Sequence, residues 1–441
     1  MLSISIIYII ICSIYLYPFC IKYLGFPELP PLTTQMIILL FFIGTYLTSF
    51  IKNKNIVSAD RIFRKYLVYV GLFLMIVFLT SVINYNNIIL VVKSLLEFGL
   101  IGLLLFLTVM EIDLSEKHQE QILTFIYALL FLQIPTTIYQ YYVLGYRDPD
   151  SISGTISSTL VGGTGVIAVL MSFLMAYGVS QILIKGFSLL RLLIVALAFV
   201  PSLLGGARVS LVLFPLTIII TIISFVLFYK KDKIKKSIQT FAMIGIAFTI
   251  VMIVFLVIIP NIRDSEYLSV DQFNATQKYE EYENGAGRYS RLQGYGLLFK
   301  GVFRNNLNII LGMGNQSITK SNTVSVHTAY LDFINYMPDS LIILASNGIL
   351  GLLLIITIIM ISLPTLKKYL HVETSKNLQV ISLSLIPVTI NIVIALFYTS
   401  TWNSQIAFSY WIILAIIFHR FSIIQRGNEL LKSLTDSKYL E

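Results

Sequence analysis

Charged side chains are scarce in this sequence, and so are cysteine, histidine and tryptophan. Only 12% of the 441 residues are Asp, Glu, Lys or Arg, whereas 57% are hydrophobic. A soluble domain cannot hide that much apolar surface, so a water-soluble globular protein is excluded. The sequence has two cysteines and four scattered histidines. It lacks the His-Glu-x-x-His pattern and the cysteine spacings of zinc sites, and we expect neither a metal nor another cofactor.

Apolar runs recur along the chain, each of about 20 residues, the length that a helix needs to cross a bilayer core. The first run has few positive residues before it and no small-residue cleavage site after it, so we interpret it as an uncleaved span rather than a signal peptide. Lipid offers no partner to a bare peptide group, which predicts an all-α, polytopic membrane protein. We predict about twelve transmembrane helices, at residues 3–21, 32–51, 66–83, 88–110, 121–144, 159–184, 187–205, 209–229, 238–259, 340–363, 379–399 and 404–424.

Lys and Arg are distributed unevenly among the predicted loops. If the N-terminus is placed in the cytoplasm, the inner loops hold most of them, whereas the short outer loops hold only Lys22, Arg147 and Arg208. Cytoplasmic loops carry an excess of Lys and Arg, so both termini are expected in the cytoplasm. The net charge of +9 is then largely a topology signal. No basic face alternates with aromatic residues on a soluble domain, and we expect no nucleic-acid partner.

One long polar interval separates the ninth and tenth predicted spans. Long loops are translocated regardless of their charge, so this interval is expected on the outer face. Within it, GRYSRLQGYGLLFKGVFR, at 287–304, predicts an amphipathic helix on the membrane surface, with Arg288 and Arg291 three positions apart on one side. The chain then divides into membrane helices one to nine (1–259), the large outer loop (260–339), membrane helices ten to twelve (340–424) and a cytoplasmic tail (425–441).

Four stretches resemble motifs of one enzyme family. SGTISSTLVGGTG, at 153–165, is similar to the Gly- and Thr-rich start of a mid-chain span in polysaccharide polymerases. LLGGARVSLVLFPL, at 203–216, is similar to the family's motif with an outward-facing arginine at a helix start. GRYSRLQGYGLLF, at 287–299, resembles an arginine before an apolar run in a large outer loop. HTAYLDFINYMPDSLIILASNGILGLLL, at 327–354, resembles a histidine followed by an aromatic residue and a Gly-x-x-Gly span.

With the large loop between the ninth and tenth helices, these stretches resemble the O-antigen polymerase and O-antigen ligase family of bacterial polytopic membrane glycosyltransferases. The resemblance implies a GT-C-like fold in the bacterial cytoplasmic (inner) membrane. It also implies transfer of a glycan from an undecaprenyl-pyrophosphate-linked donor to a hydroxyl of an acceptor sugar, on the outer face. Membrane lipids, a flippase and chain-length regulator proteins are the partners that it implies. Thr328 stands where the family often has Asn.

The same resemblance suggests which residues carry the chemistry. His327, Arg208 and Arg288 are the expected catalytic residues, and Arg291, Tyr330 and Arg147 the expected substrate-binding residues. Arginine can grip a pyrophosphate with its planar fork, and histidine can accept a proton near neutral pH. The arginines would supply the charge that Mg²⁺ supplies elsewhere, so we expect a metal-independent reaction. The acids nearby are Asp332 and Asp339; Asp332 is turned away from His327 on a helix, so we expect a single, inverting displacement.

Other interpretations remain open. Arg208 could extend to lipid phosphates, Arg288 and Arg291 could anchor a surface helix, and His327 could be a solvated loop residue. Within the enzyme interpretation, a polymerase joins lipid-linked repeat units into O-antigen or capsule, whereas a ligase moves the finished glycan to a lipid A core. We favour the polymerase. The rival class is a flippase for lipid-linked oligosaccharides, although the two halves of the sequence show no matching repeats.

Overall fold

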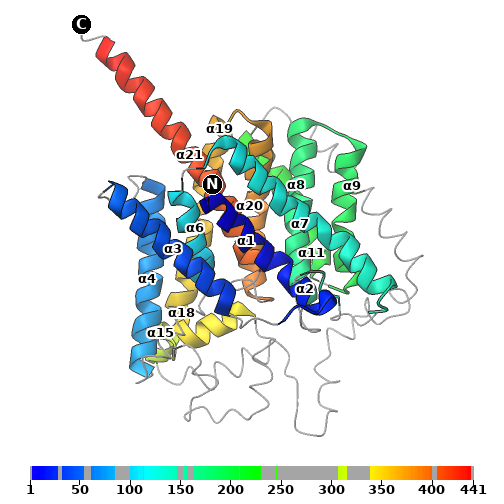
Figure 1. Ribbon diagram of the computed structural model, residues 1–441. Helices are drawn as coiled ribbons and strands as arrows, with labels where there is room; N and C mark the ends of the chain where they lie inside the picture. Colours follow the sequence, from blue (N-terminus) through cyan, green and yellow to red (C-terminus); the bar gives the residue numbers. More distant parts are fainter. Residues whose placement is uncertain are drawn as a thin grey trace.

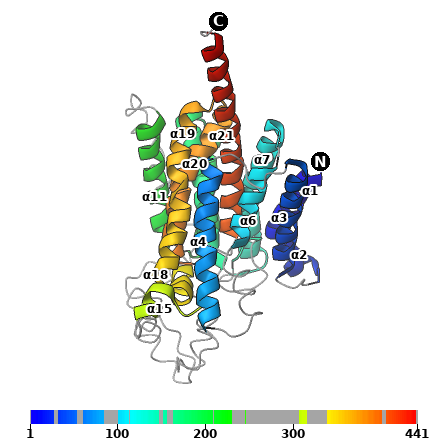
Figure 2. The ribbon, with the colours of Figure 1, turned by 90° about the vertical axis from the view of Figure 1, so that its left-hand side faces the viewer.

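The structure is a computed structural model, and every regular element that it describes is a helix. It describes residues 2–27, 32–53, 61–84, 100–112, 114–146, 152–155, 163–207, 209–229, 245, 306–314, 338–399 and 405–438. No strand occurs within these ranges, which agrees with the predicted all-α class. Figures 1 and 2 show the helices packed side by side into one bundle.

The helices have the following bounds: α1 (Leu2–Tyr15), α2 (Tyr17–Leu24), α3 (Leu32–Asn53), α4 (Arg61–Asn84), α6 (Leu100–Glu111), α7 (Glu116–Tyr142), α8 (Gly163–Lys185), α9 (Leu189–Leu197), α10 (Phe199–Leu204), α11 (Ser210–Ser224), the π-helical η1 (Phe225–Tyr229), α15 (Asn306–Leu311), α18 (Asp339–Met360), α19 (Ser362–Val372), α20 (Lys376–Leu396) and α21 (Gln405–Lys438).

Seven helices within the described ranges are long and apolar enough to cross a membrane. They coincide with seven of the predicted spans, and four shorter apolar helices coincide with others, namely Ile4–Tyr15, Ile37–Thr48, Gly102–Glu111 and Leu189–Leu204. The ninth predicted span, 238–259, lies outside the described residues except for Gly245. By the length and composition of its helices, the chain is a multi-pass membrane protein.

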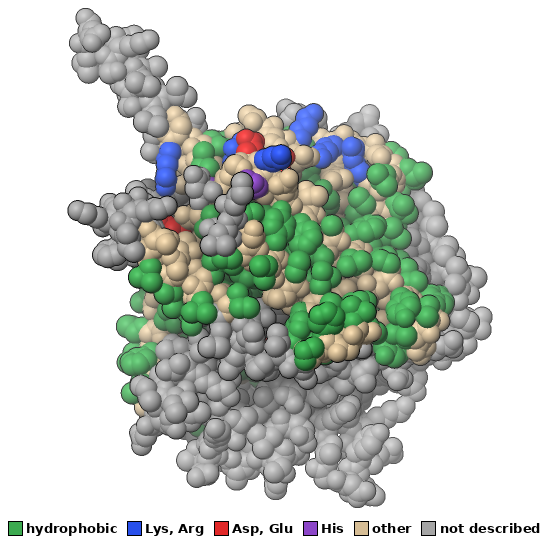
Figure 3. Space-filling model, in the orientation of Figure 1, with side chains coloured by type: hydrophobic (Ala, Val, Ile, Leu, Met, Phe, Trp, Pro, Cys, Tyr) green, Lys and Arg blue, Asp and Glu red, His purple; other side chains and the backbone are tan. Residues whose placement is uncertain are grey.

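The two ends of the bundle differ in charge. On the face that Figure 3 shows, the Lys and Arg side chains lie at one end, which we call the charged end, and a belt of hydrophobic side chains lies beside it. At the opposite end, α7, α10 and α20 end, and α8, α11 and α18 begin. We call it the glycine-rich end, because Gly154, Gly165, Gly205, Gly312 and Gly348 make close contacts there. Among the side chains described at that end, Asp339 is the only charged one.

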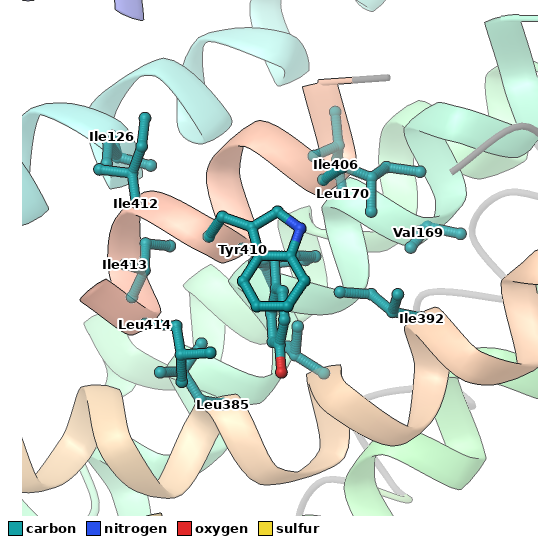
Figure 4. Close-up of a cluster of buried hydrophobic side chains, with 14 of the residues drawn as sticks. Ile126, Val169, Leu170, Leu385, Ile392, Ile406, Tyr410, Ile412, Ile413 and Leu414 are labelled. Atoms are coloured by element: carbon teal, nitrogen blue, oxygen red, sulfur yellow. The ribbon is translucent and has the colours of Figure 1, made fainter. Parts of the chain in front are cut away.

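The core of the bundle is formed by α8, α20 and α21, whose side chains are mostly buried. Figure 4 shows a cluster of buried hydrophobic side chains to which these three helices contribute Leu170, Leu385 and Ile412 and α7 contributes Ile126. The helices α4, α11 and α18 leave more apolar side chains exposed, as expected of helices that face lipid. Of the helices that begin or end at the glycine-rich end, α8 and α20 belong to this core.

The structure departs from the predicted boundaries at two helices. Instead of ending near residue 424, α21 continues to Lys438, so most of the predicted cytoplasmic tail is helical and extends beyond the bundle (Figure 1). The predicted tenth span is bent, because Gly348 interrupts α18 with φ 64° and ψ −169°. No L-residue with a side chain adopts that backbone conformation readily, so the glycine allows the bend.

Candidate functional site at the glycine-rich end

All six predicted site residues lie outside the described residues. They are Arg147, Arg208, Arg288, Arg291, His327 and Tyr330. The acid Asp332 also lies outside them, whereas Asp339 is described. Some of these positions have described neighbours in the chain: Ala207 and Val209 flank Arg208, and Tyr146 precedes Arg147. The candidate site is therefore described by the helix ends and turns that lie next to those positions in the chain.

Small residues bring three helix ends into contact. A Cβ on Gly205, just after α10, would lie 2.9 Å from Cγ2 of Thr164 at the start of α8. A Cβ on Gly165 would lie 3.1 Å from Oγ1 of Thr399. The carbonyl of Thr399 in turn accepts a hydrogen bond from the backbone N–H of Asp339, at 3.4 Å, where α18 begins. The turn after α10 and the first residues of α8 and α18 thus form one contiguous region.

The turn from α10 into α11 is built by two glycines. Gly206 takes a left-handed conformation, with φ 68°, and the N–H of Ala207 donates to the carbonyl of Ser202 at 2.9 Å. This is the common way in which glycine ends a helix. The hydroxyl of Ser210 then donates to the carbonyl of Ala207 at 2.7 Å, and α11 begins. The position of Arg208 therefore lies inside a tight connection between two helices.

Electrostatics at this end favour a negatively charged ligand. The N-terminal end of a helix carries about half a positive elementary charge, so it attracts anions. The N-terminal ends of α8, α11 and α18 all lie here, in or next to the region described above. The buried carboxyl of Asp339 stands at one of them, which leaves the ends of α8 and α11 as the positive part of the region.

A short non-helical segment, Ile152–Thr155, is buried between α7 and α8. The side chains of Ser153 and Thr155 are 0% and 1% exposed. Two buried glutamines of α7 hold its backbone. The carboxamide oxygen of Gln140 accepts hydrogen bonds from the N–H groups of Ser153 and Gly154, at 3.2 and 2.9 Å. That of Gln133 accepts one from the N–H of Thr155, at 2.9 Å.

A second segment attaches to the bend in α18. The N–H groups of Met313 and Gly314 donate to the carbonyls of Ala345 and Ser346, each at 2.8 Å. In a continuous helix those carbonyls would accept from the residues four positions later. The bend at Gly348 removes that pairing, and the segment Asn306–Gly314, which we call the strap, takes it over. The strap is the only described part of the large predicted loop other than Pro338 and Asp339.

The charged end carries polar contacts of a structural kind. The guanidinium of Arg420 in α21 pairs with Glu116 at 2.8 Å and with the fully buried carboxylate of Glu373 at 3.4 Å. The hydroxyl of Tyr369 donates to the same carboxylate of Glu373. Within the described ranges, no group of three or more His, Cys, Asp or Glu side chains is placed to hold a metal ion. These contacts tie α7, α21 and the turn between α19 and α20 together.

Sequence reasoning missed the two glutamines. Gln133 and Gln140 stand seven positions apart in a mostly apolar run, so they share one face of a helix. A buried amide needs hydrogen-bond partners. Two such residues on one face therefore indicate that polar partners lie beside this helix, and that signal is present in the sequence.

Comparison with models of known protein families gives no match, and comparison with curated proteins gives no match either. The resemblance to the O-antigen polymerase and ligase family therefore depends on the four short stretches of the sequence.

Proposed function

We propose that this protein is a glycosyltransferase that polymerises undecaprenyl-pyrophosphate-linked oligosaccharide repeat units into a surface polysaccharide. In this proposal the glycine-rich end faces the outside of the bacterial cytoplasmic membrane, and the charged end faces the cytoplasm. The donor would bind with its pyrophosphate at the glycine-rich end and its lipid chain along the bundle. The acceptor would be a sugar hydroxyl of a second lipid-linked unit.

One observation carries the proposal. Parts of three of the four stretches that resemble the family meet in one region, although they are far apart in the chain. They contribute Thr164 and Gly165, Gly205, and Asp339, and they are joined by the contacts of Gly205 with Thr164 and of Gly165 with Thr399. The helix N-termini there match the charge of a pyrophosphate.

The proposed chemistry is an inverting displacement. Arg208 and Arg288 would bind the pyrophosphate and stabilise the charge that grows on it as the bond to the anomeric carbon breaks. His327 would accept the proton of the attacking hydroxyl. Arg291, Tyr330 and Arg147 would contact the substrates. No metal ion is needed in this scheme, because the cationic side chains and helix ends carry the positive charge.

Two other functions compete with this one. A ligase would use the same donor and the same residues, but a lipid A core as the acceptor. A flippase is favoured by a specific observation: broken helices and buried irregular backbone often line transport pathways. Here α9 ends at Leu197 and α10 begins at Phe199, α18 bends at Gly348, and Ile152–Thr155 is irregular.

The deciding experiment uses the purified full chain in detergent, where no membrane separates two compartments. Lipid-linked repeat units extracted from the source organism are added, and the products are separated by size. Polymerisation predicts longer glycans that remain on the lipid carrier, with release of undecaprenyl pyrophosphate. A ligase needs added lipid A core before any transfer occurs. Movement of substrate in proteoliposomes, without any new glycosidic bond in detergent, would identify a flippase.

A further inference from the structure

The buried segment Ile152–Thr155 lies deep in the bundle. Gln133 stands two helical turns before Gln140 in α7, which is about 10 Å further from the helix end, and the segment contacts both. Irregular backbone in a membrane protein is tolerated only where the protein or a water-filled cavity satisfies it. The two side-chain carboxamides do this here, so that Gln133 and Gln140 form what we call the glutamine cradle.

The hydrogen bonds of the cradle use both oxygen atoms and both nitrogen atoms of the two carboxamides. The amide nitrogen of Gln140 donates to the carbonyl of Gly154 at 2.8 Å and to the hydroxyl of Tyr23 at 2.7 Å. That of Gln133 donates to the hydroxyl of Thr155 at 2.7 Å and to the carbonyl of Leu129 at 3.1 Å. With the three backbone N–H groups already described, the cradle fixes the segment in both position and direction.

The cradle leaves no room for a side chain at Gly154. This residue has φ 59°, and a Cβ on it would lie 2.3 Å from the carboxamide oxygen of Gln133 and 3.5 Å from Cδ1 of Ile167. Ile167 belongs to the first turns of α8, shortly after Thr164 and Gly165. The cradle therefore sets the position of α7 relative to the start of α8, the helix that contacts Gly205 and Thr399.

From these contacts we infer that Gln133 and Gln140 are positioning residues for the transfer reaction: they hold the start of α8 against the turn that contains Arg208. The inference rests on the proposed function for the reaction itself, whereas the cradle stands on the described contacts. Neither glutamine touches the substrate in this scheme. A shift of about 1 Å at a reacting group can cost about a hundredfold in rate, and loss of the cradle should have an effect of that size.

The test compares Gln133→Met and Gln140→Met with Thr137→Val. Methionine is about as long as glutamine but makes none of the bonds of the cradle. Thr137 is equally buried in α7, and among the described residues its hydroxyl bonds only to carbonyls of its own helix, at 2.9 Å to both Gln133 and Ile134, so it is a matched control. Two quantities are measured on purified full-length protein: hydrogen exchange of the peptide that contains Ser153–Thr155, and kcat on lipid-linked repeat units, per folded molecule.

We expect both methionine variants to exchange these amides faster and to lose about a hundredfold in kcat, with the control unchanged. Faster exchange with a wild-type kcat would overturn the positioning role, and unchanged exchange would overturn the cradle itself. If the wild-type protein polymerises nothing, the proposed function fails instead, and the positioning role fails with it, while the exchange data still judge the cradle.

A further variant, Gln133→Glu, keeps the inference testable if the methionine variants do not fold. In Gln133→Glu, a protonated carboxyl can still accept from the N–H of Thr155 and donate to its hydroxyl, whereas a carboxylate cannot donate. Burial favours the protonated form. The ratio of variant to wild-type kcat should therefore rise as the pH falls through the titration of the introduced carboxyl. A ratio that does not change with pH would contradict the positioning role.

Discussion

Replacing Gly348 with alanine should detach the strap from α18. Gly348 has φ 64° and ψ −169°, a conformation that costs a residue with a side chain about 1–3 kcal/mol. A Cβ there would also lie 2.2 Å from the carbonyl oxygen of Ile310 in the strap. An alanine would instead favour a regular helix, in which the carbonyls of Ala345 and Ser346 accept from within α18. Those are the carbonyls that Met313 and Gly314 now use.

The size of the effect follows from the strain. If the bend costs about 3 kcal/mol more with alanine, the equilibrium for release of the strap shifts by about a hundredfold. Hydrogen exchange at the amides of Met313 and Gly314 should accelerate by that factor. The matched control is Gly71→Ala in α4, where a Cβ would meet no atom within 4 Å. Unchanged protection of Met313 and Gly314 in the Gly348 variant would refute this account of the bend.

Four further predictions concern single substitutions and the removal of metal ions. Arg420→Met should leave the carboxylate of Glu373 buried without its cation and cost about 3 kcal/mol of stability. The loss would be measured as a lower unfolding temperature in detergent. The control Glu116→Gln, at the exposed side of the same arginine, should cost less than about 1 kcal/mol. His327→Ala should lower kcat by about 10²–10⁴-fold with donor binding intact, and a near-normal kcat would remove it from the mechanism. Arg208→Lys keeps the charge but loses the planar fork, so kcat should fall; a fully active lysine variant would indicate a lipid anchor instead. Polymerisation should continue in EDTA, and complete loss that Mg²⁺ restores would contradict the metal-independent scheme.

The helices were predictable because their signal is strong and local. Runs such as 66–83 and 379–399 are long, apolar and bounded by polar residues, and α4 and α20 coincide with them. The uneven distribution of Lys and Arg among the loops was also visible in the sequence, and the Lys and Arg side chains in Figure 3 lie at one end. Both signals depend on composition over about 20 residues rather than on any single contact.

What the sequence did not reveal depends on contacts between distant segments. The bend at Gly348 needs the strap to take over two carbonyls, and nothing within α18 alone distinguishes a bend from a straight helix with a glycine in it. The extension of α21 to Lys438 was missed because the hydropathy falls after residue 424, although its residues still permit a helix. The irregular segment 152–155 is held by hydrogen bonds with Gln133 and Gln140, which lie in another part of the chain.

The sequence predicts six site residues, and the structure describes chain neighbours of two of them, Arg147 and Arg208. Next to Arg208, Gly205 packs against Thr164. The positions of Arg208, Arg288 and His327 relative to one another remain predictions, because these residues lie outside the described ranges.

We propose that this protein forms glycosidic bonds between lipid-linked units, and this can be tested with one substrate and one purified protein. Wild-type protein in detergent is incubated with lipid-linked repeat units, with His327→Ala as the inactive control, and the glycan length on the carrier is followed by gel electrophoresis and mass spectrometry. We expect a ladder that grows by whole repeat units in the wild-type sample alone. Repeat units that remain single, under conditions in which the folded protein binds them, would contradict it.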